Sequence, residues 1–290
     1  MRLRTVLSDD GGSRAEVQLD GRWRATLARD VGTLVTAPNW RSGPTLAARQ
    51  PASEGRSAPL VTAPAKIVCC GHNYRAHIAE MGASSPQFPT LFAKFADTLT
   101  AWDADIALPG PADAVRLDWE AELAVVVGAV LSDADPETAS AGIAGYTVAN
   151  DFSVRGWQRR TSQWLQGKAF DATTPLGPDL VTPDEIDPTA GLRITCRVNG
   201  EIEQVGSTDD LVFAPAHLLS YISEFTTLRP GDVVLTGTPG GVGIAAEPPR
   251  FLRADDVVET EIEGIGLLRN RITPHRTEIN SAERNGKETR

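Results

Sequence analysis

The sequence predicts an α+β fold that is mostly β, built around a rolled or sandwiched mixed sheet. Short apolar segments typical of strands recur along the chain, turn residues separate them, and few segments have helical periodicity. The 290 residues are enough for about two domains and a large core. We expect a small β-rich N-terminal domain and linker over residues 1–64, a main domain over residues 65–273 and a polar tail over residues 274–290.

The N-terminal unit is predicted to consist of strands and one short helix. Asp20-Gly21 is a typical hairpin turn between two of the strands. The Ser-, Pro-, Ala- and Gly-rich stretch 41–64 is typical of a linker on a surface. The expected strands cover residues 2–7, 14–19 and 22–27, and the helix lies near residues 29–36.

The main domain is predicted to contain more strands than helices. Asn199-Gly200 is the strongest hairpin signal in the chain, and Ser153 is a suitable N-cap for a helix that ends at Gly167. Strands are expected over residues 66–70, 90–95, 119–127, 145–149, 192–198, 201–205, 233–236, 257–263 and 267–272. Helices are expected over residues 74–81, 153–166 and 214–225.

Composition excludes several classes of partner. The 38 acidic and 28 basic residues give a net charge of −10, which argues against nucleic acid or an anionic membrane as the main partner. No apolar run is long enough to span a bilayer, and the N-terminus has no signal-peptide pattern. The three cysteines, Cys69, Cys70 and Cys196, cannot form a disulfide framework or a CxxC zinc site. We therefore expect a cytoplasmic protein.

The first candidate site is Glu120-Ala121-Glu122, within an otherwise apolar strand. Alternation places both carboxylates on the same face of the strand. Two like charges that leave water together repel each other unless a cation lies between them. A solvated edge strand is the ordinary alternative for such a pair. The apolar run that follows, residues 123–127, favours instead a site for a hard cation such as Mg²⁺, Mn²⁺ or Ca²⁺.

A third acidic residue, Asp151, follows Asn150 at the end of the apolar strand 145–149. Asp and Asn also end strands and cap helices without any further role. If the two strands are neighbours, Asp151 completes a set of three carboxylates and leaves coordination positions for substrate and water. The sequence alone leaves open whether they are neighbours.

His77 and Glu80 are candidates for a general base. On the predicted helix they are three residues apart, so they share a face and can form a hydrogen bond. A carboxylate that holds one imidazole nitrogen fixes the tautomer and raises the basicity of the other nitrogen. Such pairs also occur by chance, so the motif alone does not define a catalytic site. No HExxH motif is present, so a zinc protease is not indicated.

Two further features are candidates for substrate binding. Lys168 can neutralise a substrate carboxylate beside an anionic metal site, with a surface lysine as the alternative. The glycine-rich segment 236–243 lacks the Lys of a phosphate loop and the helix of a dinucleotide fold. Its backbone N–H groups can approach a carboxylate, with a plain tight turn as the alternative.

These segments together resemble the fumarylacetoacetate hydrolase family over residues 66–272. The matching motifs, in the family's order, are Gly71–Met81, Asp118–Leu123, Ala149–Gln158, Gly167-Lys168 and Gly237–Gly243. The resemblance implies a mixed β-sandwich roll, a homodimer, and a Mg²⁺ or Mn²⁺ ion held by Glu120, Glu122 and Asp151. It also implies that His77 and Glu80 form a water-activating dyad on a lid helix, with Lys168 stabilising the enolate. The substrate-binding residues that it implies are Arg155, Gln158, Thr238 and Tyr74.

The position of Cys70 indicates the branch of the family. Animal-type fumarylacetoacetases carry a further aspartate ligand there, so the chain is similar to the smaller bacterial-type members. That branch implies hydrolysis of a C–C bond in a 2,4-dioxo acid of the acylpyruvate or fumarylpyruvate type, releasing pyruvate and a carboxylic acid in aromatic compound catabolism. The alternatives are an oxaloacetate decarboxylase or a 2-oxo acid hydratase or isomerase that uses the same metal-stabilised enolate. The lid after Glu80 and the N-terminal unit are expected to contact the distal end of the substrate.

The presence of all three carboxylates and of the His77–Glu80 pair argues against a non-enzymatic relative.

Overall fold

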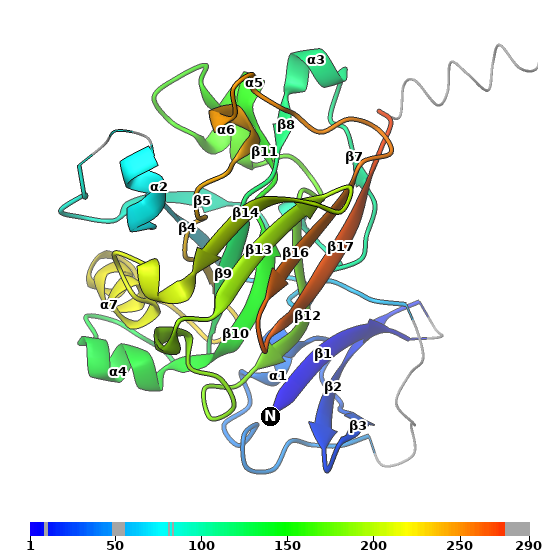
Figure 1. The fold of residues 1–290 in the computed structure, drawn as a ribbon. Helices are drawn as coiled ribbons and strands as arrows, with labels where there is room; N and C mark the ends of the chain where they lie inside the picture. Colours follow the sequence, from blue (N-terminus) through cyan, green and yellow to red (C-terminus); the bar gives the residue numbers. More distant parts are fainter. Residues whose placement is uncertain (9–10, 48–55, 81, 83, 276–290) are drawn as a thin grey trace, which may run out of the picture.

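The computed structural model describes residues 1–8, 11–47, 56–80, 82 and 84–275. Within this part of the chain, the strands form a ten-stranded sheet, a five-stranded sheet and one two-stranded pair (Figure 1). The predicted α+β, mostly β fold is confirmed. The tail expected over residues 274–290 lies outside the described residues except for its first two.

The ten-stranded sheet has the buried strands β9 and β10 near its middle. Its order is β3 (Arg22–Ala25), β2 (Ser13–Leu19), β1 (Arg2–Leu7), β12 (Thr174–Val181), β10 (Ile143–Asn150), β9 (Ala121–Val127), β15 (Val233–Leu235), β4 (Ile67–Gly71) and β5 (Thr90–Lys94), and β6 (Leu99–Thr100) also pairs with β12. Every residue of β9 and β10 is buried. Both faces of these strands are covered, which explains their continuous apolar sequence.

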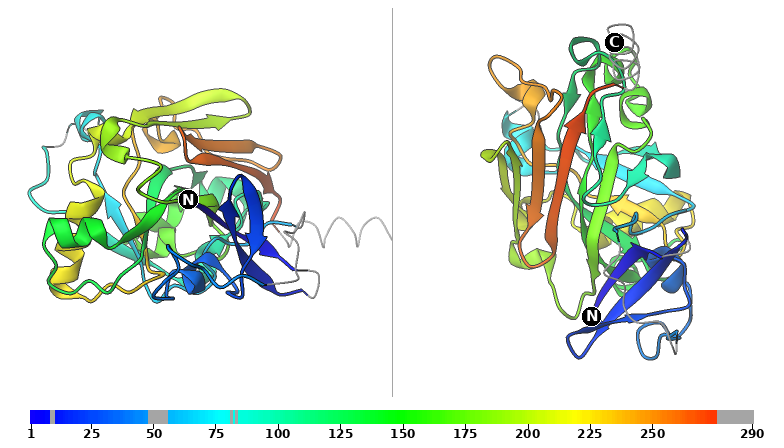
Figure 2. Two further views of the ribbon diagram at one scale, coloured as in Figure 1. Left: turned by 90° about the horizontal axis from the view of Figure 1, so that it is seen from below. Right: turned by 90° about the vertical axis from the view of Figure 1, so that its right-hand side faces the viewer.

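The five-stranded sheet covers one face of β9 and β10 (Figure 2). Its order is β14 (Glu201–Ser207), β13 (Arg193–Val198), β16 (Val257–Ile262), β17 (Gly266–Thr273) and β7 (Ile106–Ala107). Leu123 and Val125 of β9 belong to the core between the sheets, with Ile194 and Leu268. The intervening residues of β9 face a second core, formed with the N-terminal segment. Alternate residues of β9 thus contribute to two apolar cores, one on each face of the strand.

Seven α-helices lie around the sheets in the described part of the chain. They are α1 (Val31–Leu34), α2 (Arg75–Glu80), α3 (Ala112–Val115), α4 (Pro136–Ala141), α5 (Arg155–Gln158), α6 (Leu165–Lys168) and α7 (Pro215–Phe225). Helices α4 and α7 pack on each other. Helices α2, α5 and α6 contribute walls to a cavity where β9 begins. None of the described helices is long and apolar enough to cross a membrane.

The helix expected over residues 153–166 is wrong. Ser153 and Val154 form the short strand β11, which pairs with β8 (Leu117–Asp118). The Ser153 hydroxyl donates to the Asp151 carbonyl oxygen instead of capping a helix. Two short helices, α5 and α6, follow and fold against each other, because Gly167 allows the backbone to approach Gln158. The apolar spacing in this segment therefore reflects two short elements rather than one continuous helix.

The strand β12 was not expected from the sequence. It contains Pro175, Gly177 and Pro178, residues that normally argue against a strand inside a sheet. It nevertheless pairs with both β1 and β10. Because β1 continues the main sheet through β12, the N-terminal strands are hydrogen-bonded to the main unit. The domain boundary at residue 64 stays a prediction.

Asn73 anchors the connection between β4 and the helix α2. Its side-chain amide donates to the carbonyl oxygens of Phe213 and Thr236 at 3.0 and 2.7 Å, and its carbonyl oxygen accepts the Phe213 N–H at 2.8 Å. The residue is fully buried, so no water can replace these partners. The start of α2 is therefore fixed to two distant segments.

We expect Asn73→Ala to lower the free energy of unfolding by at least about 2 kcal/mol, because buried backbone groups lose their partners. Urea denaturation measures this change. Asn39→Ala is the matched control, because the Asn39 amide donates to the Gly43 carbonyl oxygen on the surface. Its effect should stay below about 1 kcal/mol. Equal losses in the two variants would contradict this account of Asn73.

Candidate metal centre and active site

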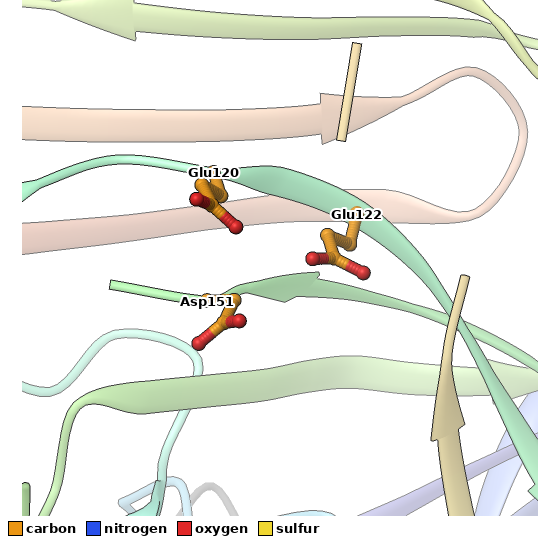
Figure 3. Close-up of side chains that lie close together, drawn as sticks. All are labelled: Glu120, Glu122 and Asp151. Carbon is orange, nitrogen blue, oxygen red and sulfur yellow. The ribbon is translucent and has the colours of Figure 1, made fainter. Parts of the chain in front are cut away.

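The pairing of β9 and β10 brings three carboxylates together, as Figure 3 shows. Glu122 pairs in register with Ala149, and the Asp151 N–H donates to the Glu120 carbonyl oxygen at 2.9 Å. Carboxylate oxygens of Glu120, Glu122 and Asp151 lie within 4.8 Å of one another. The two strands are thus neighbours, as the metal-site hypothesis required.

The Asn150 side chain links the backbone that carries the carboxylates to the five-stranded sheet. Its side-chain oxygen accepts the Glu120 N–H at 3.0 Å, and its amide donates to the Thr260 hydroxyl of the five-stranded sheet at 2.9 Å. Asn150 and Thr260 are fully buried. The carboxylates therefore project from a backbone that both sheets hold in place.

Buried cations contact two of the three carboxylates. Lys168 Nζ donates to Glu120 Oε2 at 2.6 Å and to Asp151 Oδ2 at 2.7 Å. Lys94 donates to the other oxygen of Asp151, and Arg155 Nη1 lies 2.7 Å from Glu120 Oε1. Burial alone would raise the pKa of Glu120, but Lys168 and Arg155 outweigh it and lower that pKa to about 2. Glu120 is therefore ionised at neutral pH.

Glu122 differs from the other two carboxylates. Its Oε2 accepts the Gly237 N–H at 2.6 Å, and no described Lys, Arg or His forms an ion pair with it. It is 1% exposed. Burial, followed by the nearby charges of Asp151 and Glu120, raises the pKa of Glu122 well above its ordinary value. The site thus holds a buried acid that lacks a positive partner.

The charges of the site fit a divalent metal ion. In the described chain, four buried carboxylates (Asp118, Glu120, Glu122 and Asp151) meet three buried cations (Lys94, Arg155 and Lys168). When all four carboxylates are ionised, as metal binding requires, one negative charge remains, and it falls on the cluster that contains Glu122. Carboxylate oxygens are the ligands that Mg²⁺ and Mn²⁺ prefer. The donor set therefore suits such an ion, with Glu120, Glu122 and Asp151 as its holders.

Asp118 is a structural partner that the sequence analysis did not single out. Its carboxylate accepts the Arg155 Nε–H at 2.8 Å and the N–H groups of Gly243 and Ile244 at 2.7 and 3.0 Å. It therefore orients Arg155 and the glycine-rich loop together. The available signal was its spacing, because Asp118 continues the alternation of Glu120 and Glu122.

Lys94 was also missed. It is 3% exposed and lies at the end of β5, against Asp151. A lysine is seldom so fully buried unless an acid pairs with it. A lysine inside the apolar segment 90–95 was the available signal, but its partner is distant in sequence.

His77 and Glu80 meet as predicted. Nδ1 of His77 lies 2.9 Å from Glu80 Oε2. An ionised carboxylate can only accept, so Nδ1 donates and Nε2 keeps its lone pair. The Glu80 carboxylate packs on Gly240, where a Cβ atom would lie 2.8 Å from Oε2. The Ala76 N–H donates to Asp210, which fixes the first turn of α2.

The other predicted residues take several positions. Lys168, Arg155, Gln158 and Thr238 all line the same cavity as His77, Glu120 and Glu122. Gln158 accepts from Arg155 at 2.8 Å, and the Thr238 hydroxyl accepts from Gln204 at 2.8 Å. Tyr74 is fully buried in the apolar core and is not in the cavity wall, so its predicted contact with substrate gains no support. The backbone of the glycine-rich loop does meet a carboxylate, at Glu122.

The cavity measures about 130 Å³. His72, Phe92 and Trp164 form an aromatic part of its wall, with Trp164 in edge contact with both of the others. Gly71 makes room for Trp164, because a Cβ atom there would lie 2.4 Å from the indole. Among the described residues, the wall includes none from 1–64 and none from 84–91. The expected distal contacts from those segments stay a prediction.

Cys70 also lines the cavity. Burial, followed by the charge of Glu122, raises the pKa of the Cys70 thiol to about 12. The neutral thiol is a poor ligand for a hard cation. The three cysteines are all buried and free, in agreement with the expectation that no disulfide framework exists.

Comparisons with known proteins identify a family model and relatives that match most of the chain. Residues 66–273 match the family model described as fumarylacetoacetate (FAA) hydrolase C-terminal. The human protein named oxaloacetate tautomerase FAHD2A, mitochondrial, is 45% identical over 224 residues, which are 77% of this chain and 71% of that one. The Dictyostelium discoideum fumarylacetoacetate hydrolase domain-containing protein 2 homolog is 40% identical over 221 residues, 72% of each chain.

Solved structures with this fold carry different activities in their names. Fumarylacetoacetate hydrolase from Exiguobacterium antarcticum superposes with a TM-score of 0.83 at 30% identity, over 95% of this chain and 100% of that one. The 2-hydroxyhepta-2,4-diene-1,7-dioate isomerase from Mycobacterium marinum gives 0.75 at 32% identity, over 94% of this chain and 98% of that one. Similarity alone thus leaves the reaction type open. The cytoplasmic location also stays a prediction, since the human relative is named as mitochondrial.

We expect Glu122→Gln to raise the melting temperature of the metal-free protein by about 2 °C or more, because it removes a buried carboxyl group whose ionisation is disfavoured by burial and by the neighbouring carboxylates. The same variant should lose the rise in melting temperature that Mg²⁺ gives the parent protein. Thermal unfolding in EDTA and in excess Mg²⁺ measures both effects. The Gln side chain can still accept the Gly237 N–H, so the local hydrogen bond remains.

Glu224→Gln on the exposed face of α7 is the matched control and should change neither quantity. The account fails if Glu122→Gln destabilises the metal-free protein and keeps the full response to Mg²⁺.

Proposed function

Since this chain belongs to the fumarylacetoacetate hydrolase family of enzymes, we propose that it interconverts the keto and enol forms of a small 2-oxo dicarboxylate such as oxaloacetate. The observation that carries the proposal is the high identity to a relative named oxaloacetate tautomerase. The metal centre, the His77–Glu80 pair and the cations of the cavity supply suitable chemistry. This reaction corresponds to the 2-oxo acid isomerase that the sequence analysis gave as an alternative.

The size of the cavity favours a small substrate. A cavity of about 150 Å³ in another protein accommodates benzene, whereas pockets for drug-sized ligands measure about 300–1,000 Å³. At about 130 Å³, this cavity suits a four-carbon acid better than a longer dioxo acid. Oxaloacetate is therefore the first substrate to test.

The His77–Glu80 pair can carry the proton. In the keto form of oxaloacetate, a base removes a proton from C3, the electron pair forms the C2–C3 double bond, and the 2-oxo oxygen becomes an enolate and takes a proton. His77 has Nδ1 bonded to Glu80, so Nε2 is available to accept the C3 proton. The Glu80 carboxylate then stabilises the imidazolium that forms.

Lys168 and Arg155 can bind the oxygens of the 2-oxo acid. The Lys168 ammonium has three N–H donors, and two of them are bound to Glu120 and Asp151, which leaves one for a substrate oxygen. Arg155 uses Nε and Nη1, and its Nη2 has no hydrogen bond within the described part of the chain. Both side chains stabilise negative charge as it develops on the 2-oxo oxygen. A bound Mg²⁺ or Mn²⁺ ion would supply Lewis acidity to the same charge.

C–C hydrolysis of an acylpyruvate is a second candidate. The His77–Glu80 pair favours it over decarboxylation, because attack by water on the distal carbonyl carbon needs a base and decarboxylation does not. The same cations stabilise the pyruvate enolate that leaves. Both candidates share one site, so substrates must separate them. The homodimer and the role in aromatic compound catabolism stay proposals.

We expect the purified protein with Mg²⁺ to speed the loss of the ultraviolet absorbance of enol-oxaloacetate in proportion to its concentration. His77→Asn should lower kcat by at least about 100-fold, because it removes the general base. The exposed His217→Asn is the matched control and should keep full activity.

A panel of acylpyruvates and fumarylpyruvate, followed by release of pyruvate, tests the second candidate under the same conditions. Pyruvate release that depends on His77, without any effect on enol-oxaloacetate, would replace tautomerisation by hydrolysis as the function.

A further inference from the structure

We infer that Arg159 binds the distal carboxylate of the substrate and thereby sets a preference for 2-oxo dicarboxylates over 2-oxo monocarboxylates. The inference rests on the proposed function, since it assigns the second carboxylate of the same substrate to a residue. Arg159 belongs to none of the family motifs identified in the sequence.

The first argument is the state of the cations in the cavity wall. Among the described residues, three permanently charged cations line it: Arg155, Arg159 and Lys168. Arg155 and Lys168 are buried and bonded to the carboxylates of the metal centre. The Arg159 side chain forms no hydrogen bond, ion pair or ring contact with any described residue, although Arg159 lines the same cavity. Its guanidinium therefore remains available for a ligand.

The second argument is the position of Arg159. It follows the last residue of α5, and its N–H donates to the Trp157 carbonyl oxygen. Arg155 and Gln158 of this helix are buried beside the metal centre, whereas Arg159 is exposed. The cavity thus has its buried cations at the floor and an arginine at its rim. An acid whose 2-oxo end lies at the floor would extend its other end toward this rim.

The third argument is the chemistry of the rest of the wall. Phe92 and Trp164 are apolar, and Trp164 packs against His72. Burial, followed by the charge of His77, lowers the pKa of His72, so this imidazole is neutral at neutral pH. A carboxylate at the distal end therefore has Arg159 as its fixed positive partner in the described wall. A guanidinium can bind both oxygens of a carboxylate.

The test compares two acids with the same four-carbon chain. Oxaloacetate ends in a carboxylate where 2-oxobutyrate ends in a methyl group. Calorimetric titration with Mg²⁺ present measures the dissociation constant of each acid for the parent protein and for Arg159→Gln, Arg159→Lys and Arg160→Gln. Arg160 is the matched control, because it has the same charge and stacks on Trp157 at 3.5 Å outside the cavity wall.

We expect the parent protein and Arg160→Gln to bind oxaloacetate at least about tenfold more tightly than 2-oxobutyrate. Arg159→Gln should lose most of this ratio with unchanged affinity for 2-oxobutyrate, and Arg159→Lys should recover part of it. A parent protein that binds the two acids equally, or an Arg159→Gln variant that keeps the full ratio, would overturn the inference.

The binding measurement also separates this inference from the proposed function. One outcome is that the protein has no tautomerase activity while its preference for oxaloacetate over 2-oxobutyrate still depends on Arg159. That result would support the contact between Arg159 and the carboxylate and would contradict only the proposed tautomerisation. Loss of the ratio in Arg160→Gln as well would show a general effect of surface charge and would overturn the role of Arg159.

Discussion

The site depends on a concentration of negative charge that the protein buries and does not fully neutralise. Burying an ion costs several kcal/mol unless opposite charge and hydrogen bonds accompany it. Lys94, Lys168 and Arg155 meet most of this requirement, and Glu122 keeps only the Gly237 N–H in the described chain. A divalent ion would remove the remaining imbalance. We therefore expect this part of the fold to be less stable without such an ion.

The carboxylates and His77 are held in place by different parts of the fold. The carboxylates project from the middle of the main sheet, where β9 and β10 are covered on both faces and Asn150 joins the two sheets. His77 instead belongs to a six-residue helix, which side-chain bonds from Asn73 and Asp210 attach to the rest of the chain. The proposed proton transfer can therefore depend on the docking of α2, while the proposed metal binding depends on the sheet. Substitutions in the two parts should separate these properties.

Local patterns predicted much of this arrangement, and long-range contacts did not follow from them. The alternation of Glu120 and Glu122 and the spacing of His77 and Glu80 were visible because each pair lies within one element. The partners of Asp118 and Lys94 were not visible, because Arg155 and Asp151 are 37 and 57 residues away in sequence. The prolines of β12 concealed a strand that tertiary pairing stabilises. Periodicity could not predict that Asp151 lies beside Glu120 and Glu122. That prediction came from the family resemblance.

The central claim is that Glu120, Glu122 and Asp151 together hold one divalent ion. A crystal grown with Mn²⁺ and measured at the manganese absorption edge tests it directly, because anomalous scattering locates the ion without reference to the protein. The account predicts a single strong anomalous peak within coordination distance of oxygens from all three carboxylates. A map with no peak there, and with Lys94 and Lys168 still bonded to Asp151, would contradict it.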